Sequence, residues 1–145
     1  MVRVEWTFSP KLSFQLYVQP LIVSGDYTRF KELRKPREFE FDIYGKQQGI
    51  VGSDSTGAVV IDPDAGGPAP SFSFSNPDFN FRSFRGNAVL RWEYRPGSAL
   101  FLVWQQNRGE TQPFGDFDFS RDFKALLQNG PENVVAVKAT YWLGI

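Results

Sequence analysis

The strongest constraint on this chain is a period of two in its apolar residues. The stretch "GNAVLRWEYRPGSALFLVW", from Gly86 to Trp104, carries this alternation on both sides of Pro96-Gly97. Side chains two residues apart lie on the same face of a β-strand, and Pro-Gly favours a turn, so the stretch predicts a hairpin with one apolar face. The open question is whether that face meets a protein core or lipid.

The same pattern predicts five long strands, at residues 2–8, 12–23, 80–94, 98–106 and 133–145. Two connections are minimal, "SPK" and "RPGS", whereas residues 25–78 and 107–132 are long. Within the long connections, "EFEFDIY" and "GAVVID" indicate a small hairpin in residues 38–62, and "SRDFKALLQNG" indicates a short helix between a Ser120 cap and a Gly130 stop. We therefore expect one all-β segment over residues 1–145, built of antiparallel up-and-down strands.

Composition narrows the chemistry. Sixteen basic and sixteen acidic residues cancel, which leaves no bulk attraction to nucleic acid, so we expect no nucleic-acid partner. The chain has no histidine and no cysteine, which removes the usual general base, the commonest metal ligand and any disulfide. We therefore expect no catalysis in this segment.

Two architectures fit five amphipathic strands. One is a soluble β-sandwich, for example a carbohydrate- or ligand-binding module of a secreted enzyme. The other is an outer-membrane β-barrel, which has apolar side chains outside, polar ones in the lumen, aromatic girdles at the interfaces, short periplasmic turns and long extracellular loops. The alternation of short and long connections favours the barrel, with residues 25–78 and 107–132 extracellular. Aromatic residues near the predicted strand ends form the expected girdle: Trp6, Trp92, Tyr94, Trp104, Tyr141 and Trp142.

The C-terminal half also carries a resemblance. "VKATYWLGI", with Tyr141, Leu143 and Ile145, looks like the C-terminal strand signal that the barrel-assembly machinery recognises. "FNFRSFRGNAVLRWEYRPGSALFLVW" together with "VKATYWLG" resembles the C-terminal barrel-forming domain of unknown function in bacterial outer-membrane proteins that carry a family-nine-like carbohydrate-binding domain near their N-terminus. The resemblance implies a barrel fold in the bacterial outer membrane, and it carries over no catalytic residue.

Five strands are fewer than the roughly eight of the smallest membrane barrels. The chain also starts in the middle of an alternating pattern and lacks the layout of a signal peptide. We therefore expect it to be the C-terminal portion of a barrel, completed by further strands of the same protein or by other copies, with the lipid bilayer as a partner.

Several residue groups are candidate sites. Asp54, Asp62 and Asp64 offer oxygen ligands for a possible calcium ion, the one cofactor considered. Glu38, Glu40 and Asp42 share a strand face, which indicates a solvated surface more than acid–base chemistry. Two further sets are a possible ligand platform, Phe72, Phe74, Phe79 and Phe81, and a possible lumen lining, Arg85, Arg91, Glu93 and Lys138.

The register of the hairpin at Pro96-Gly97 separates two arrangements. A two-residue type II turn would pair Tyr94 with Ala99 and put Arg91 on the face of Leu102. A three-residue loop with Gly97 in the left-handed region would instead join Leu90 and Trp92 to Leu100, Leu102 and Trp104. We predict the second arrangement, because it gives one continuous apolar band and leaves Arg91, Glu93 and Gln105 for the lumen.

Overall fold

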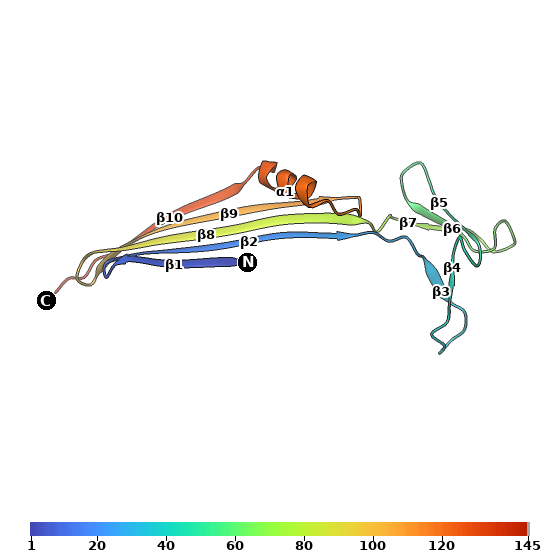
Figure 1. Ribbon diagram of the computed structural model, residues 1–145, viewed down its shortest axis with the longest axis horizontal. Helices are drawn as coiled ribbons and strands as arrows, with labels where there is room; N and C mark the ends of the chain where they lie inside the picture. The colour runs from blue at the N-terminus through green and yellow to red at the C-terminus, as the bar shows by residue number, and fades with distance from the viewer. Residues whose placement is uncertain (145) are drawn as a thin grey trace. The chain divides into compact units, whose positions relative to one another are not determined.

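The computed structural model describes residues 1–144 and divides the chain into two units (Figure 1). The first, here called the sheet unit, contains residues 1–23, 80–112 and 117–144, and the second, the insertion unit, contains residues 24–79 and 113–116. The predicted C-terminal residue of the strand signal, Ile145, lies outside the described residues.

The sheet unit is a five-stranded sheet whose strands are neighbours in chain order (Figure 1). Its strands are β1 (Val2–Ser9), β2 (Leu12–Gly25), β8 (Phe79–Arg95), β9 (Ser98–Gln112) and β10 (Glu132–Thr140). The predicted all-β, antiparallel class is confirmed. Over residues 1–144 the sheet is open, with β1 and β10 as its edges.

The predicted register at Pro96-Gly97 is confirmed. Leu90 lies opposite Leu102 and Trp92 lies opposite Leu100, while Gly97 has φ +75°. The predicted loop length is wrong, because Arg95 pairs with Ser98 across a two-residue turn and the register shifts at a bulge between Glu93 and Arg95.

The other short turn is built in the same way. A register shift between Thr7 and Ser9 precedes a turn after which Ser9 pairs with Leu12. The Glu93 backbone N–H donates to the Lys11 carbonyl at 2.7 Å, so both short turns lie at the same end of the sheet.

Two predicted strand bounds are wrong. β9 continues to Gln112, six residues past the predicted end, because β8 provides pairing partners up to Asn80. β10 stops at Thr140 instead of continuing to the C-terminus, because its last partner, Ala99, lies next to the first residue of β9.

One helix, α1 (Phe119–Gln128), connects β9 to β10. Its caps differ from the prediction: Asp118 is the N-cap and its side chain accepts from the Arg121 N–H, and Asn129 is the C-cap. Asp118 displaces Ser120 because its carboxylate reaches the free N–H groups of the first turn. Across residues 1–144, no helix is long and apolar enough to cross a membrane.

The insertion unit contains two small sheets rather than the one predicted hairpin. β3 (Lys31–Leu33) pairs with β4 (Phe41–Ile43), and β5 (Ile50–Ser53), β6 (Val59–Asp62) and β7 (Phe72–Phe74) form the second sheet. The two predicted strands, β4 and β6, therefore pair with segments that the sequence pattern did not reveal. A core of Tyr44, Val59 and Ile61, packed against Phe30, Val51 and Phe74, explains the pairing, because it buries side chains of β5, β6 and β7 against the residues that flank β3 and β4.

Candidate functional site: a sheet with one apolar and one charged face

The lower part of the sheet, next to the short turns, has one face without a charged side chain. We call it the apolar face. Its cross-strand rows are Val2 with Val18, Val4 with Leu16, and Trp6 with Phe14 on β1 and β2, and Ala88–Trp104–Val135, Leu90–Leu102–Val137 and Trp92–Leu100–Ala139 on β8, β9 and β10. Because directly opposed residues point to the same side, the rows of β1 and β2 form one apolar surface, and so do the rows of β8, β9 and β10.

The opposite face of the same strand segments carries their charged side chains, and we call it the charged face. Arg3 lies opposite Tyr17 and Glu5 opposite Gln15, and Arg91 lies opposite Phe101, which in turn faces Lys138. A cavity of about 210 Å³ is lined by residues of three strands, among them Arg3, Gln15, Tyr17, Asn87 and Val89, so the charged face is continuous from β1 to β8.

The predicted lumen residues Arg85, Arg91, Glu93 and Lys138 all lie on the charged face. Arg91 pairs with Glu93 at 3.1 Å, and the Lys138 ammonium lies 5.9 Å from the Phe101 ring centroid. Arg85 lines a separate cavity of about 410 Å³ together with Phe81 and Asn107. Arg91, Glu93 and Lys138 thus have local partners, which lowers the cost of placing these charges away from bulk water.

Aromatic side chains cluster at the short turns. Tyr94 donates to the Thr140 carbonyl at 3.1 Å, and Arg95 donates to the Tyr141 hydroxyl at 2.6 Å and stacks on its ring. The Trp142 backbone N–H donates to Ser98 Oγ at 2.9 Å. The residues after β10 are therefore held against the turn although they are no longer part of the strand.

The other predicted girdle residues lie further along the strands. Trp6 stacks on Phe8 at 5.7 Å, and Trp92 meets Tyr94 edge to face at 6.1 Å. Trp104 lies at the opposite margin of the apolar rows, where its indole N–H donates to Asn133 Oδ1 at 3.0 Å. Aromatic residues thus occupy both margins of the apolar face.

The upper part of the same face is polar and covered. Beyond the Ala88–Trp104 row, the rows on this face of β8 and β9 include Arg82 opposite Glu110 and Asn80 opposite Gln112. Helix α1 packs here: the Asn80 side-chain amide donates to Asp122 at 3.0 Å, and Arg82 lies 3.2 Å from Glu110 and 3.9 Å from Asp122. Asn80, Arg82 and Asp122 are all buried, so the helix is fixed through a buried polar cluster.

Asp122 is the centre of this cluster. The Arg121 guanidinium donates to its carboxylate at 2.9 Å and, with the Asn80 amide, holds the pKa of Asp122 at about 2, although burial acts in the opposite direction. Sequence reasoning missed this site. The available signal was the presence of Asn80 and Arg82 at positions whose parity is otherwise apolar.

The proposed calcium ligands are not brought together. Asp54 accepts from the N–H groups of Thr56 and Ala58, and Asp64 accepts from those of Gly67 and Ala69, so both carboxylates close their own turns. Asp62 accepts from the Asp64 N–H. Within the described part of the chain, no three His, Cys, Asp or Glu side chains gather to hold a metal.

The acidic strand of the insertion unit is neutralised by basic neighbours. Arg34 lies 2.7 Å from Asp42 and 3.1 Å from Glu40, and Lys35 lies 3.9 Å from Glu38. Arg34 lowers the pKa of Asp42. A general acid needs a raised pKa, which Asp42 does not have, and all three carboxylates form surface ion pairs.

A second polar pair supports the core of the insertion unit. The Tyr44 hydroxyl donates to Glu32 at 2.6 Å, and the Gln48 amide donates to the same carboxylate. Both bonds lower the pKa of Glu32, whereas the bond to Glu32, together with burial, raises the pKa of Tyr44 to about 12.

The four phenylalanines of the possible platform are divided between the units. Phe72 stacks on Phe74 with ring centroids 6.4 Å apart, and Phe74 meets Phe30 edge to face at 5.2 Å, so this pair belongs to the packing of the insertion unit. Phe79 is assigned to the same unit, whereas Phe81 belongs to the sheet unit. The sequence pattern did not distinguish core packing from an exposed platform.

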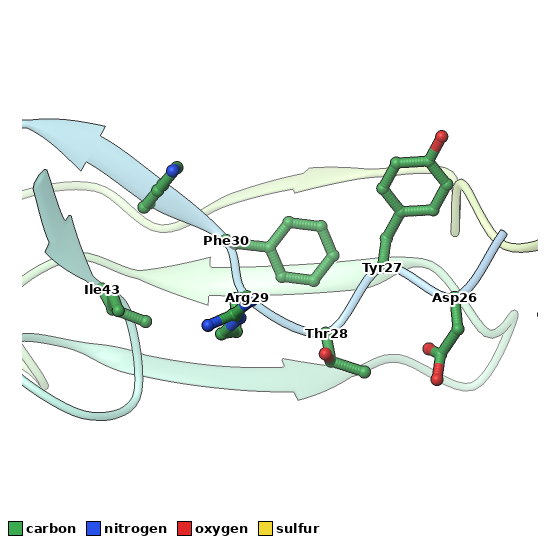
Figure 2. A pocket seen from close by; sticks show the side chains of 7 residues that line it. Asp26, Tyr27, Thr28, Arg29, Phe30 and Ile43 are labelled. Atoms are coloured by element: carbon green, nitrogen blue, oxygen red, sulfur yellow. The ribbon is translucent and has the colours of Figure 1, made fainter.

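The insertion unit has a cavity of its own, of about 340 Å³ (Figure 2). One continuous segment, residues 26–31, lines it together with Ile43 of β4. Figure 2 shows Asp26, Tyr27 and Thr28 in succession along this segment, followed by Arg29 and Phe30. The lining thus combines a carboxylate, hydroxyls, a guanidinium and aromatic rings, which are groups that bind polar ligands.

Comparison with curated proteins and with solved structures gives no match. The model of the family described as "Domain of unknown function (DUF5916)" matches residues 2–145, and the chain therefore belongs to this family.

Proposed function

We propose that the chain is the C-terminal part of a bacterial outer-membrane β-barrel, with a structural or a transport and binding role and with no catalysis in this segment. The observation that carries this proposal is the separation of charge between the two faces of the five-stranded sheet. Outer-membrane barrels separate their side chains in the same way, apolar toward lipid and polar toward the lumen.

The exposure of the apolar face supports lipid as its environment. A soluble sandwich covers the apolar face of each sheet with a second sheet. Here Trp6, Val135 and Val137 are 61%, 64% and 66% exposed, and they belong to rows that continue across the sheet. Contiguous apolar surface of this kind is typical of membrane or protein contact sites.

In this proposal the charged face lines the lumen. The Arg91–Glu93 pair and Lys138 then face water, next to Tyr17, Gln15 and Asn87. Lumen residues of such barrels determine selectivity rather than stability.

The two edges of the sheet indicate what completes the barrel. Every residue of β1 and of β10 is exposed, and both strands have an edge without a partner among residues 1–144. Unpaired backbone groups are very costly in lipid, so both edges must pair with further strands, from the same protein or from other copies. The barrel-assembly machinery is the partner we propose for β10 and the following Tyr141 and Leu143.

A thiol scan along β10 tests the proposal. Residues 1–145 contain no cysteine, so Val135→Cys, Ala136→Cys and Val137→Cys each introduce the one thiol of this segment, and any cysteine elsewhere in the protein is first replaced by serine. In the full-length protein folded into phosphatidylcholine vesicles, we expect residues 135 and 137 to be shielded from a charged, water-soluble maleimide and residue 136 to react. Equal reaction at all three positions, or a monodisperse monomer in buffer without detergent, would refute the proposal.

The cavity of the insertion unit favours a second candidate function, recognition of a carbohydrate or another small polar ligand, as in a soluble binding module of a secreted enzyme. Tyr27 and Phe30 offer ring faces, and Asp26 and Arg29 offer charged hydrogen-bonding groups. Calorimetric titration with soluble oligosaccharides tests it. Arg29→Ala should abolish binding, whereas Lys46→Ala, away from the lining, should not. Equal affinities of the two variants would exclude this cavity.

A further inference from the structure

Helix α1 leaves most of its large apolar side chains exposed. A helix on a soluble protein buries its apolar stripe against the core. In α1 the side turned to the sheet is held by the Asp122 cluster, and Leu126 is the one apolar side chain that is fully buried within the described helix. The remaining large apolar side chains of the helix lie beside this contact and are exposed.

These side chains form a regular stripe. Phe119, Phe123 and Leu127 are spaced by four residues and are 62%, 38% and 49% exposed. The Phe119 and Phe123 rings stack with centroids 5.6 Å apart. Four-residue spacing places the three on one side of the helix, so the stripe is continuous.

The stripe borders a groove that has no polar lining residue. Phe117, Phe119 and Phe123 line it on one side and Pro20, Leu21 and Ile22 of β2 on the other, around about 310 Å³. Such a groove suits an extended hydrocarbon chain and offers nothing to a polar ligand.

The position of α1 connects the stripe to the apolar face. Asn80, Arg82 and Arg108, which hold the helix, have the same parity as Leu90 and Leu102. The Arg108 guanidinium donates to the carbonyls of Leu127 and Asn129. The helix therefore covers the polar rows immediately above the apolar rows and restores an apolar surface at that level.

We propose that α1 is an interfacial helix that inserts its Phe119–Phe123–Leu127 stripe among the acyl chains of membrane lipid, at the outer margin of the apolar face. This inference rests on the proposed membrane function and deepens it. Amphipathic helices with Phe and Leu on one side lie in the bilayer interface in this way. The polar cluster beneath the helix then stays out of contact with lipid.

The test uses adjacent pairs of residues in the full-length protein folded into phosphatidylcholine vesicles. Phe123→Cys and Leu127→Cys report on the stripe, and the matched controls Lys124→Cys and Gln128→Cys lie on exposed positions beside it. Each thiol is labelled with an environment-sensitive fluorophore, and nitroxide-labelled lipids serve as quenchers. We expect blue-shifted emission and quenching by nitroxides high on the acyl chain at residues 123 and 127, and neither effect at residues 124 and 128.

A label at Val137→Cys distinguishes a failure of the helix proposal from a failure of the proposed membrane function. If residue 137 is quenched by nitroxides deep in the bilayer while residues 123 and 127 behave like their controls, the helix proposal is wrong and the membrane function stands. If residue 137 is not quenched either, the membrane function fails. Blue-shifted emission at residues 123 and 127 without lipid, increasing with protein concentration, would instead indicate a protein partner and would also overturn the helix proposal.

Discussion

The sharpest consequence of the two-faced sheet concerns two adjacent residues of β9. Leu102 lies on the apolar face between Leu90 and Val137, and Val103 lies on the charged face between Val89 and Ala136. Both are at the same height on the same strand. Replacing each in turn by arginine therefore changes only the face to which the charge is added.

The expected difference is large. An arginine on the lipid face of a membrane barrel costs about 2–4 kcal/mol near the bilayer midplane, which is roughly a 30- to 900-fold change in the folding equilibrium. The row of Leu102 is the middle one of the three on β8, β9 and β10, so the upper half of this range applies. In a water-exposed sheet, Leu102→Arg at a side chain 43% exposed would change stability by only about 0.5 kcal/mol.

Urea unfolding of the full-length protein in phosphatidylcholine vesicles measures the difference, and tryptophan fluorescence supplies the signal. We expect Leu102→Arg to lose several kcal/mol of unfolding free energy and Val103→Arg to lose much less, because Val103 faces the lumen in the proposed barrel. Equal losses, or a larger loss for Val103→Arg, would show that the apolar face does not contact lipid.

Three further predictions concern the polar contacts and the backbone. The pKa of Asp122 in the fold, about 2, lies below its ordinary value of 3.8, so its stabilisation is complete above that value and is lost as the pH falls through 2. Asp122→Asn should therefore lower the unfolding free energy at pH 7 by about 1–3 kcal/mol and remove this acid dependence. Urea titrations of both proteins at pH 7 and near pH 2 will show the two effects. Tyr44, whose pKa is raised to about 12, should ionise near that pH in a spectrophotometric titration, and Tyr44→Phe should remove this step. The stabilisation by Tyr44 should be complete below pH 10 and be lost as the pH rises through 12. Gly49→Ala should destabilise the insertion unit by more than about 1 kcal/mol in thermal unfolding, because φ is +60° and the new Cβ would lie 2.2 Å from the Asp62 carbonyl oxygen, whereas Gly52→Ala, with nothing within 4 Å, should be nearly neutral.

The long strands could be predicted from the sequence because their period of two extends over many residues. Each of the five predicted strands is present, and the pairing of Leu90 with Leu102 followed from the requirement that the apolar parity be continuous across the hairpin. A shift by one residue would have placed Arg91 on the apolar face. The pattern therefore determined the register even though it did not reveal the bulge that produces it.

The short strands of the insertion unit could not be predicted in the same way. β3 and β7 contain three residues each, too few to show a period, and the pairing in this unit depends on the contacts of Tyr44 and Ile61 with distant segments. The aspartates were ambiguous for a related reason. Asp54 and Asp64 have the residue type of calcium ligands, but an isolated carboxylate in a Gly-rich loop equally closes a turn on its own backbone.

The end of the apolar rows explains why β9 continues past the segment in which apolar and polar residues alternate. On the face that carries the apolar rows, the opposed side chains of β8 and β9 change from Leu90 and Leu102 to Arg82 and Glu110 within eight residues. The backbone pairing continues without interruption over the same distance. In the proposed barrel, apolar alternation stops where the strand leaves the bilayer, and the strand itself continues beyond that level. The buried Arg82 needs a cover there, and Asp122 of α1 supplies the cover and shares the countercharge with Glu110 of β9. The position of the upper margin of the apolar face thus explains together the extension of β9, the buried charge and the helix with its exposed apolar stripe.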